Sequence, residues 1–154
     1  MKFTLTAIAI CSSFIAPAYA TPTVTALFAA IEATGTTIVV DAPRICNDKD
    51  MMGMYEYTKN VIDQLTVCVA NHHGNSDEVF DTLLHESVHI AQACNDGNPL
   101  FTAHSIAAVA RPLEIETVRR FYPASQFNRE LEARVIARDQ DEVFVTELIK
   151  EHCK

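Results

Sequence analysis

The segment His85-Glu86-Ser87-Val88-His89 has the HExxH spacing, and it lies inside an apolar run of the chain. On an α-helix, residues i and i+4 project from the same face, so both histidines can bind one metal ion. Glu86 stands roughly 100° around the helix from His85, where a general base can take a proton from a metal-bound water. The pattern predicts a hydrolytic zinc site with His85 and His89 as ligands and Glu86 as the catalytic base.

The flanking residues predict that this segment is one helix, over about 76–94. Asn75 and Glu78 fit a capping box, and the run from Asn95 to Pro99 is typical of a helix end. An apolar face opposite the two histidines is formed by Phe80, Leu83, Leu84, Val88 and Ala91. The helix is therefore expected to bury one face and present two imidazoles on the other. The alternative is a core helix with two incidental histidines.

A catalytic zinc ion takes three protein ligands and keeps one position for water, so a further ligand must follow His89. Four glutamates in predicted helices compete for this place: Glu114, Glu116, Glu130 and Glu132. Glu130 shares a helical face with Ala133 and Ala137, whose small side chains permit a close approach of two helices. Glu132 falls on a more charged face. Glu130 is the predicted third ligand, and Glu132 stays open as the alternative.

HESVH followed by a helix with the sequence Arg129-Glu130-Leu131-Glu132-Ala133-Arg134 resembles the gluzincin metallopeptidases. It is most similar to small bacterial and phage-borne HExxH proteins with an ExEA element, over about residues 65–138. In gluzincins the glutamate that opens an ExxxD motif is a metal ligand, and this position matches Glu130. The resemblance implies a zincin-like fold, bound zinc and peptide hydrolysis. Where the family has an aspartate that orients the first histidine, this chain has Arg134, which leaves the partner of His85 open.

Peptide hydrolysis also needs a donor for the oxyanion that develops on the scissile carbonyl, and Tyr122 and His104 are the candidates. Either could instead be structural or on the surface. Gln92, one turn past His89, could support the metal ligands or be an ordinary amide of the core or surface. His72 and His73 are expected in a surface loop rather than at the metal.

Residues 1–20 have the features of an export signal. Lys2 gives the positive start, residues 3–16 the apolar core, and Ala18-Tyr19-Ala20 the cleavage site. The apolar stretch is shorter than the roughly 20 residues that span a bilayer. We therefore expect one domain over residues 21–154, secreted or periplasmic, with no membrane span; an uncleaved anchor is the alternative.

The chain carries a formal charge of −8, which becomes −9 when Lys2 is removed with the signal. An acidic chain without a basic run argues against nucleic acid or an anionic membrane as partner, and leaves a peptide or protein substrate. The mature chain keeps four cysteines, which predict two disulfides in an exported protein. The predicted pairs are Cys46–Cys68 and Cys94–Cys153. Zinc binding by cysteine is the alternative, but no CxxC pair supports it.

The order of elements predicts the α+β class: a small domain with a central HExxH helix, a short antiparallel sheet and a helical C-terminal half. The expected strands are 36–40 and a hairpin of 51–57 with 61–70; helices are expected at 22–34, 76–94, 101–110, 113–121, 125–138 and 141–153. The strand that ends at Ala70 is a candidate exposed edge that binds an extended peptide, or else an ordinary core strand.

Together these features predict an exported zinc peptidase. Two alternatives remain: an exported metal-binding or partner-binding domain that keeps the zinc helix without catalysis, and a disulfide scaffold with no metal.

Overall fold

The computed structural model describes residues 21–154, so the predicted export signal and its cleavage site lie outside the described residues. The strands are β1 (Thr37–Val40), β2 (Gly53–Thr58) and β3 (Ile62–Val67). The helices are α1 (Pro22–Ala33), α2 (Pro43–Cys46), the 3-10 helix η1 (Val69–His72), α3 (Ser76–Cys94), α4 (Ala103–Val109), α5 (Pro112–Phe121), α6 (Phe127–Asp139) and α7 (Glu142–His152). This content confirms the predicted α+β class.

The three strands form one sheet in the order β1-β3-β2. β2 and β3 form the predicted antiparallel hairpin, whereas β1 pairs with β3 in parallel, so the sheet is mixed. Of the two interpretations of the strand expected to end at Ala70, the exposed edge is wrong and the core strand is confirmed, because β3 is the central strand of the sheet. The strand ends earlier than predicted, since the backbone turns into η1 after Val67. The edge strand next to α3 is β2.

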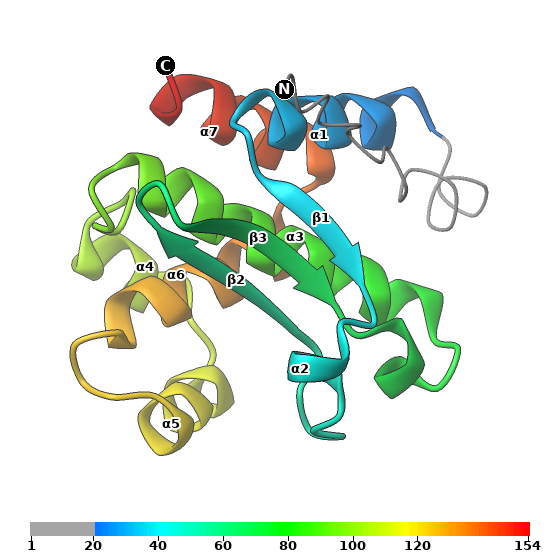
Figure 1. Ribbon diagram of the computed structural model, residues 1–154. Coiled ribbons are helices and arrows are strands. Elements are labelled where there is room, and N and C mark those ends of the chain that lie inside the picture. The colour runs from blue at the N-terminus through cyan, green and yellow to red at the C-terminus, as the bar shows by residue number, and fades with distance from the viewer. Residues whose placement is uncertain (1–20) are drawn as a thin grey trace, which may run out of the picture.

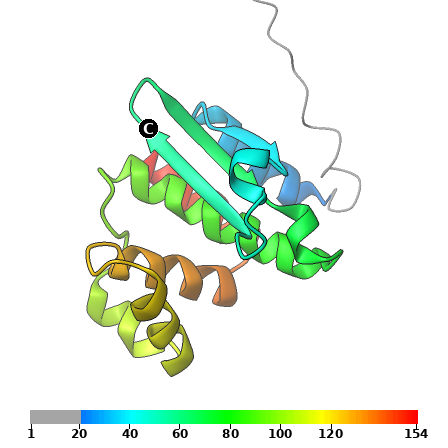
Figure 2. The same ribbon diagram turned by 60° about the horizontal axis from the view of Figure 1, so that its bottom comes forward.

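The sheet, α3 and the C-terminal helices form successive layers (Figure 2). α3 lies across one face of the sheet, and α7 packs along α3 with α1 beside it (Figure 1). α6 crosses α3 on the side that faces away from the sheet, and α4 and α5 pack on α6. The main core therefore surrounds α3 on several sides, with Leu83, Val88 and Ile90 buried among residues of the sheet, α1, α6 and α7.

The ends of α3 are set by local side-chain chemistry. The Asn75 side chain accepts a hydrogen bond from the backbone N–H of Glu78, so one of the free N–H groups of the first turn is capped. After Cys94 the chain leaves the helix through Asp96 and Gly97, both at positive φ. The prediction of a helix over about 76–94 is confirmed, because both signals are short-range.

Gly53 allows β2 to lie unusually close to α3. A Cβ atom at this position would be 2.5 Å from Cγ2 of Thr82 and 3.2 Å from Cγ of Glu86, too close for any other residue without a shift of the strand. A side chain here would therefore push the edge strand away from the central helix.

Both predicted disulfides are present. Cys46–Cys68 joins α2 to the residue after β3, and Cys94–Cys153 joins the end of α3 to the residue after α7. Two disulfides fit a chain that folds in an oxidising compartment. Within residues 21–154, none of the helices combines the length and the apolar character needed to cross a membrane.

The disulfides should contribute strongly to stability, because they close loops of 22 and 59 residues. The chain-entropy estimate is about 3–4 kcal/mol for each. We expect the Cys94→Ala/Cys153→Ala pair to lower the melting temperature by about 10 °C or more, and the Cys46→Ala/Cys68→Ala pair by somewhat less. Calorimetry of the oxidised protein and both double variants measures this. Peptide maps with crossed pairs, or double variants as stable as the parent protein, would contradict the assignment.

Candidate metal centre

Side chains from two helices converge at the crossing of α3 and α6. His85 and His89 lie one turn apart on α3, and Glu130 lies in the first turn of α6. The two Nε2 atoms are 3.2 Å apart, and each is 3.5 Å from one carboxylate oxygen of Glu130. The structure thus brings together the three residues that the sequence singled out as metal ligands.

The spacing of these atoms suits one small cation. Ligands held roughly 2.0–2.1 Å from a tetrahedral ion lie about 3.3–3.4 Å apart, close to all three separations. Two neutral imidazoles with acceptor Nε2 atoms at 3.2 Å would direct lone pairs at each other. A cation between them removes that repulsion. His85, His89 and Glu130, with side chains 15%, 10% and 8% exposed, therefore fit a metal ion by donor type and by geometry.

The electrostatics of the cluster also favour a positive charge. Burial by itself raises the pKa of Glu130, but hydrogen bonds and charge interactions with His85 and His89 hold that pKa well below its usual range. Burial lowers the pKa of His89, yet contacts with Glu130, together with the charge of Glu86, raise it above its ordinary value. These shifts reflect the attraction between the Glu130 carboxylate and positive charge at the two histidines.

The orientation of His89 is fixed by a buried hydrogen-bond chain. Its Nδ1 lies 2.7 Å from Oε1 of Gln92. The amide nitrogen of Gln92 donates to Oε2 of Glu132 and to the backbone oxygen of Arg129, which assigns the amide oxygen to the histidine side. Nδ1 of His89 is then the donor, and in the neutral imidazole Nε2 carries the lone pair on the side that faces His85 and Glu130. Gln92 is therefore a buried amide, not a surface one, and its hydrogen bond orients His89.

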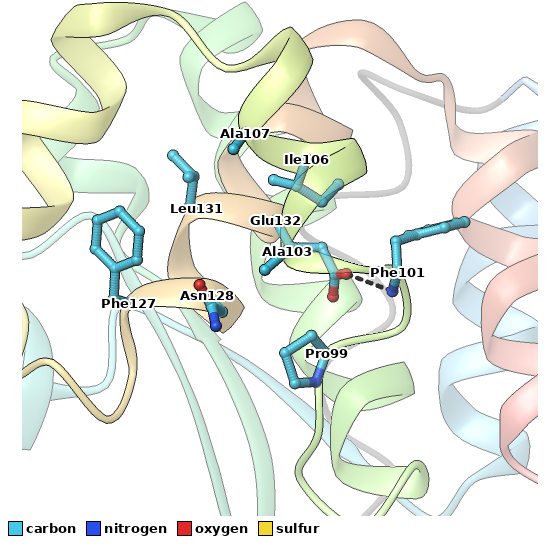
Figure 3. A pocket seen from close by; sticks show the side chains of 9 residues that line it. All are labelled: Pro99, Phe101, Ala103, Ile106, Ala107, Phe127, Asn128, Leu131 and Glu132. Atoms are coloured by element: carbon cyan, nitrogen blue, oxygen red, sulfur yellow. Dashed lines mark hydrogen bonds between the residues drawn. The ribbon is translucent and has the colours of Figure 1, made fainter.

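Glu132 lies behind the cluster and does not belong to it. Its carboxylate accepts hydrogen bonds from the backbone N–H groups of Leu100 and Phe101, at 2.9 and 2.7 Å, as well as from Gln92. Figure 3 shows the carboxylate facing Phe101 at a small cavity of about 130 Å³, which none of the three clustered residues lines. The expectation that Glu132 falls on a charged face is wrong, because its side chain is fully buried to hold the loop after α3.

The other two glutamates considered as ligands lie elsewhere. Glu114 forms an ion pair with Arg138, and Glu116 is exposed on α5. Among residues 21–154, no hydrogen bond reaches Nδ1 of His85, so no carboxylate takes the place of the family's aspartate there.

Glu86 is held by the edge strand. The backbone N–H of Tyr55 on β2 donates to Oε2 of Glu86 at 2.8 Å, and the Glu86 residue is 8% exposed. One oxygen is thereby fixed, while the second has no hydrogen bond from residues 21–154 and keeps its lone pairs. The sequence could not indicate this contact, because the donor is a backbone group brought close by Gly53.

A cleft of about 420 Å³ opens beside the cluster and is lined by His85 and Glu86. Tyr122, at the end of α5, lines the same cleft, whereas His104 is exposed on α4 and does not. Burial raises the pKa of the Tyr122 hydroxyl and Glu130 raises it further, against the opposing effect of Arg134. The phenol is therefore a neutral donor at ordinary pH. Of the two candidate donors, the structure places Tyr122 at the cleft.

The opposite wall of the cleft comes from the loop 47–52, which a buried asparagine holds in place. The side-chain amide of Asn71 in η1 donates to the backbone oxygens of Cys46, Asp48 and Met51. The prediction of a surface loop is wrong for the neighbouring His72, which is buried with Nε2 3.2 Å from the Thr82 hydroxyl. This histidine supports the packing of η1 on α3.

The comparisons with known proteins give a family and no activity. Neither a curated protein nor a solved structure matches this chain. One family model, described as "Domain of unknown function (DUF8637)", matches residues 25–154, which is most of the chain and includes every residue of the cluster and its supports. The chain belongs to this family of unknown function, DUF8637.

Proposed function

We propose that this protein is an exported zinc-dependent peptidase. The observation that carries the proposal is the triangle of His85 Nε2, His89 Nε2 and the Glu130 carboxylate, with separations of 3.2, 3.5 and 3.5 Å. Two imidazoles and one carboxylate are the protein ligands of a hydrolytic zinc ion that keeps a position open for water. The gluzincin-type resemblance of the sequence supports the same function.

Bound Zn²⁺ would supply a Lewis acid that lowers the pKa of a coordinated water toward about 7 and polarises a carbonyl oxygen. Glu86 would then take up the proton at its free oxygen, because the Tyr55 N–H holds the other one in place. The same carboxylate can pass that proton to the leaving amine. Tyr122, a neutral phenol at the cleft, would donate a hydrogen bond to the developing oxyanion.

The shape of the site supports a peptide as substrate. The cleft of about 420 Å³ runs between α3 and α6 and opens to solvent. β2 forms the free edge of the sheet beside α3, so an extended chain could pair with its backbone. Secretion or a periplasmic location follows from the export signal of the sequence and agrees with two disulfides.

Glu86→Gln tests the catalytic role directly. The variant removes proton transfer and keeps the metal ligands, so we expect unchanged zinc content and a fall in peptide hydrolysis of about 10²–10⁴-fold. Asp77→Asn, which neutralises an exposed carboxylate in the first turn of the same helix, serves as the matched control and should stay active. Assays with a broad peptide mixture and casein measure turnover.

Two outcomes would be decisive. An active Glu86→Gln variant would show that HESVH is not the catalytic centre. A wild-type protein that binds zinc and hydrolyses no peptide would favour the non-catalytic metal-binding domain.

Alanine substitutions of Glu130 and Glu132 should have different effects: the first on zinc affinity, the second on the free energy of unfolding. Glu130→Ala removes one ligand, so zinc affinity and hydrolysis should both collapse while the fold persists. Glu132→Ala removes the acceptor of the partly buried N–H groups of Leu100 and Phe101 and of the buried Gln92 amide, at a cost of about 2–4 kcal/mol of unfolding free energy. Its zinc affinity should fall less, through the looser orientation of Gln92 and His89.

Competition with a chromogenic chelator and urea unfolding in EDTA measure these two quantities for each variant. The reverse pattern, with zinc lost only in Glu132→Ala, would overturn the ligand assignment.

A further inference from the structure

The cleft beside the metal cluster contains an arginine that has no carboxylate partner. Arg134 lies one turn after Glu130 on α6, and its side chain lines the cleft together with His85 and Glu86. None of the ion pairs among residues 21–154 includes it. Its Nε is buried without a hydrogen bond, and the guanidinium carbon lies 6.0 Å from the centre of the Tyr122 ring.

A second arginine of α6, Arg138, has a structural role in the same cleft. Arg138, one turn further along α6 and in the same cleft, forms ion pairs with Glu114 and Asp139 and donates to the backbone oxygen of Val109. Its charge is neutralised within the protein. Arg134 lines the same cleft and lies against Tyr122, but no carboxylate of residues 21–154 neutralises its charge in an ion pair. An unpaired guanidinium at a partly enclosed site favours an incoming anion, to which its terminal nitrogens can donate.

The rest of the cleft restricts where an anion can bind. Asp50 and Asp81 line it from the loop before β2 and from α3, so negative charge gathers on the side away from α6. Burial raises the pKa of Asp81, and the nearby charges of Asp77 and Glu78 on the same helix raise it further. A chain with a net charge of −8 repels anions in general. An anion is therefore recognised at the wall of the cleft that α6 forms, where Arg134 lies.

We propose that Arg134 binds a carboxylate of the substrate, next to the bond that is cut. A guanidinium presents its donors in the planar fork that matches a carboxylate. Four residues separate Arg134 from Glu130, a rise of about 6 Å along the helix axis, so the bound carboxylate belongs to a residue adjacent to the scissile bond. It is either the C-terminal carboxylate of a peptide or the side chain of an aspartate or glutamate. The inference rests on the proposed peptidase function for its substrate class.

The test uses zinc-loaded protein with its disulfides intact and N-acetylated pentapeptides in matched sets. One set compares free with amidated C-termini, and the other compares glutamate with glutamine at each internal position of amidated peptides. Mass spectrometry gives kcat/KM for each peptide. Calorimetric binding to the zinc-loaded Glu86→Gln protein gives affinities that do not depend on turnover. Arg134→Gln removes the charge, Arg134→Lys keeps it without the fork, and Arg138→Gln is the matched loss of a charge that is already paired.

We expect the wild type to prefer the carboxylate over its neutral counterpart by about tenfold or more, in kcat/KM and in affinity. Arg134→Gln should abolish this preference, Arg134→Lys should keep part of it, and Arg138→Gln should keep it. Preference for free C-termini assigns the carboxylate to the chain end, and preference for internal glutamate assigns it to a side chain.

The two proposals can fail separately. Hydrolysis without any preference, or a preference that survives Arg134→Gln, would overturn the role of Arg134 and leave the peptidase standing. If the wild type bound the carboxylate peptides preferentially but hydrolysed none of them, the role of Arg134 would stand and the peptidase function would be overturned. Zinc content and circular dichroism of each variant show whether the fold is retained.

Discussion

The crossing of α3 and α6 is the constraint on which the site depends. A single buried chain of hydrogen bonds runs across it, from His89 through Gln92 to Glu132 and on to the backbone of the loop after α3. Because His89, Gln92 and Glu132 are all buried, each needs its hydrogen-bond partner, and a shift of either helix would break several bonds at once. The same crossing brings Glu130 to the two histidines.

The remaining elements hold α3 in place around this crossing. One disulfide fastens the end of α3 to α7, and the other fastens α2 to the chain directly before η1. On the sheet side, Gly53 lets β2 approach closely enough for the Tyr55 N–H to bind Glu86. The two histidines and Glu86 are thus oriented from opposite sides of one helix, by α6 and by the edge strand. The proposed base and the proposed metal ligands are therefore positioned by separate contacts.

The sequence predicted the parts of the fold that local chemistry decides. The limits of α3 follow from Asn75 and Gly97, and the proximity of Glu130 follows from the small residues on its helical face. Long-range pairing was not predictable in the same way. The parallel contact of β1 with β3 depends on where the intervening chain returns, and the burial of Glu132 depends on backbone N–H groups about thirty residues before it in the chain. The charge of Glu132 suggested a position at the surface, but hydrogen bonds from two backbone N–H groups compensate for the loss of solvent around its carboxylate.

The central claim is that two histidines and one glutamate of this chain bind a single zinc ion. X-ray absorption at the zinc edge of the purified, zinc-loaded protein measures this most directly, together with zinc content by mass. The account predicts one zinc per chain, with nitrogen and oxygen ligands at about 2.0–2.1 Å and outer-shell scattering from two imidazoles. A protein that retains no stoichiometric zinc, or a spectrum with sulfur at about 2.3 Å or only one imidazole, would contradict it.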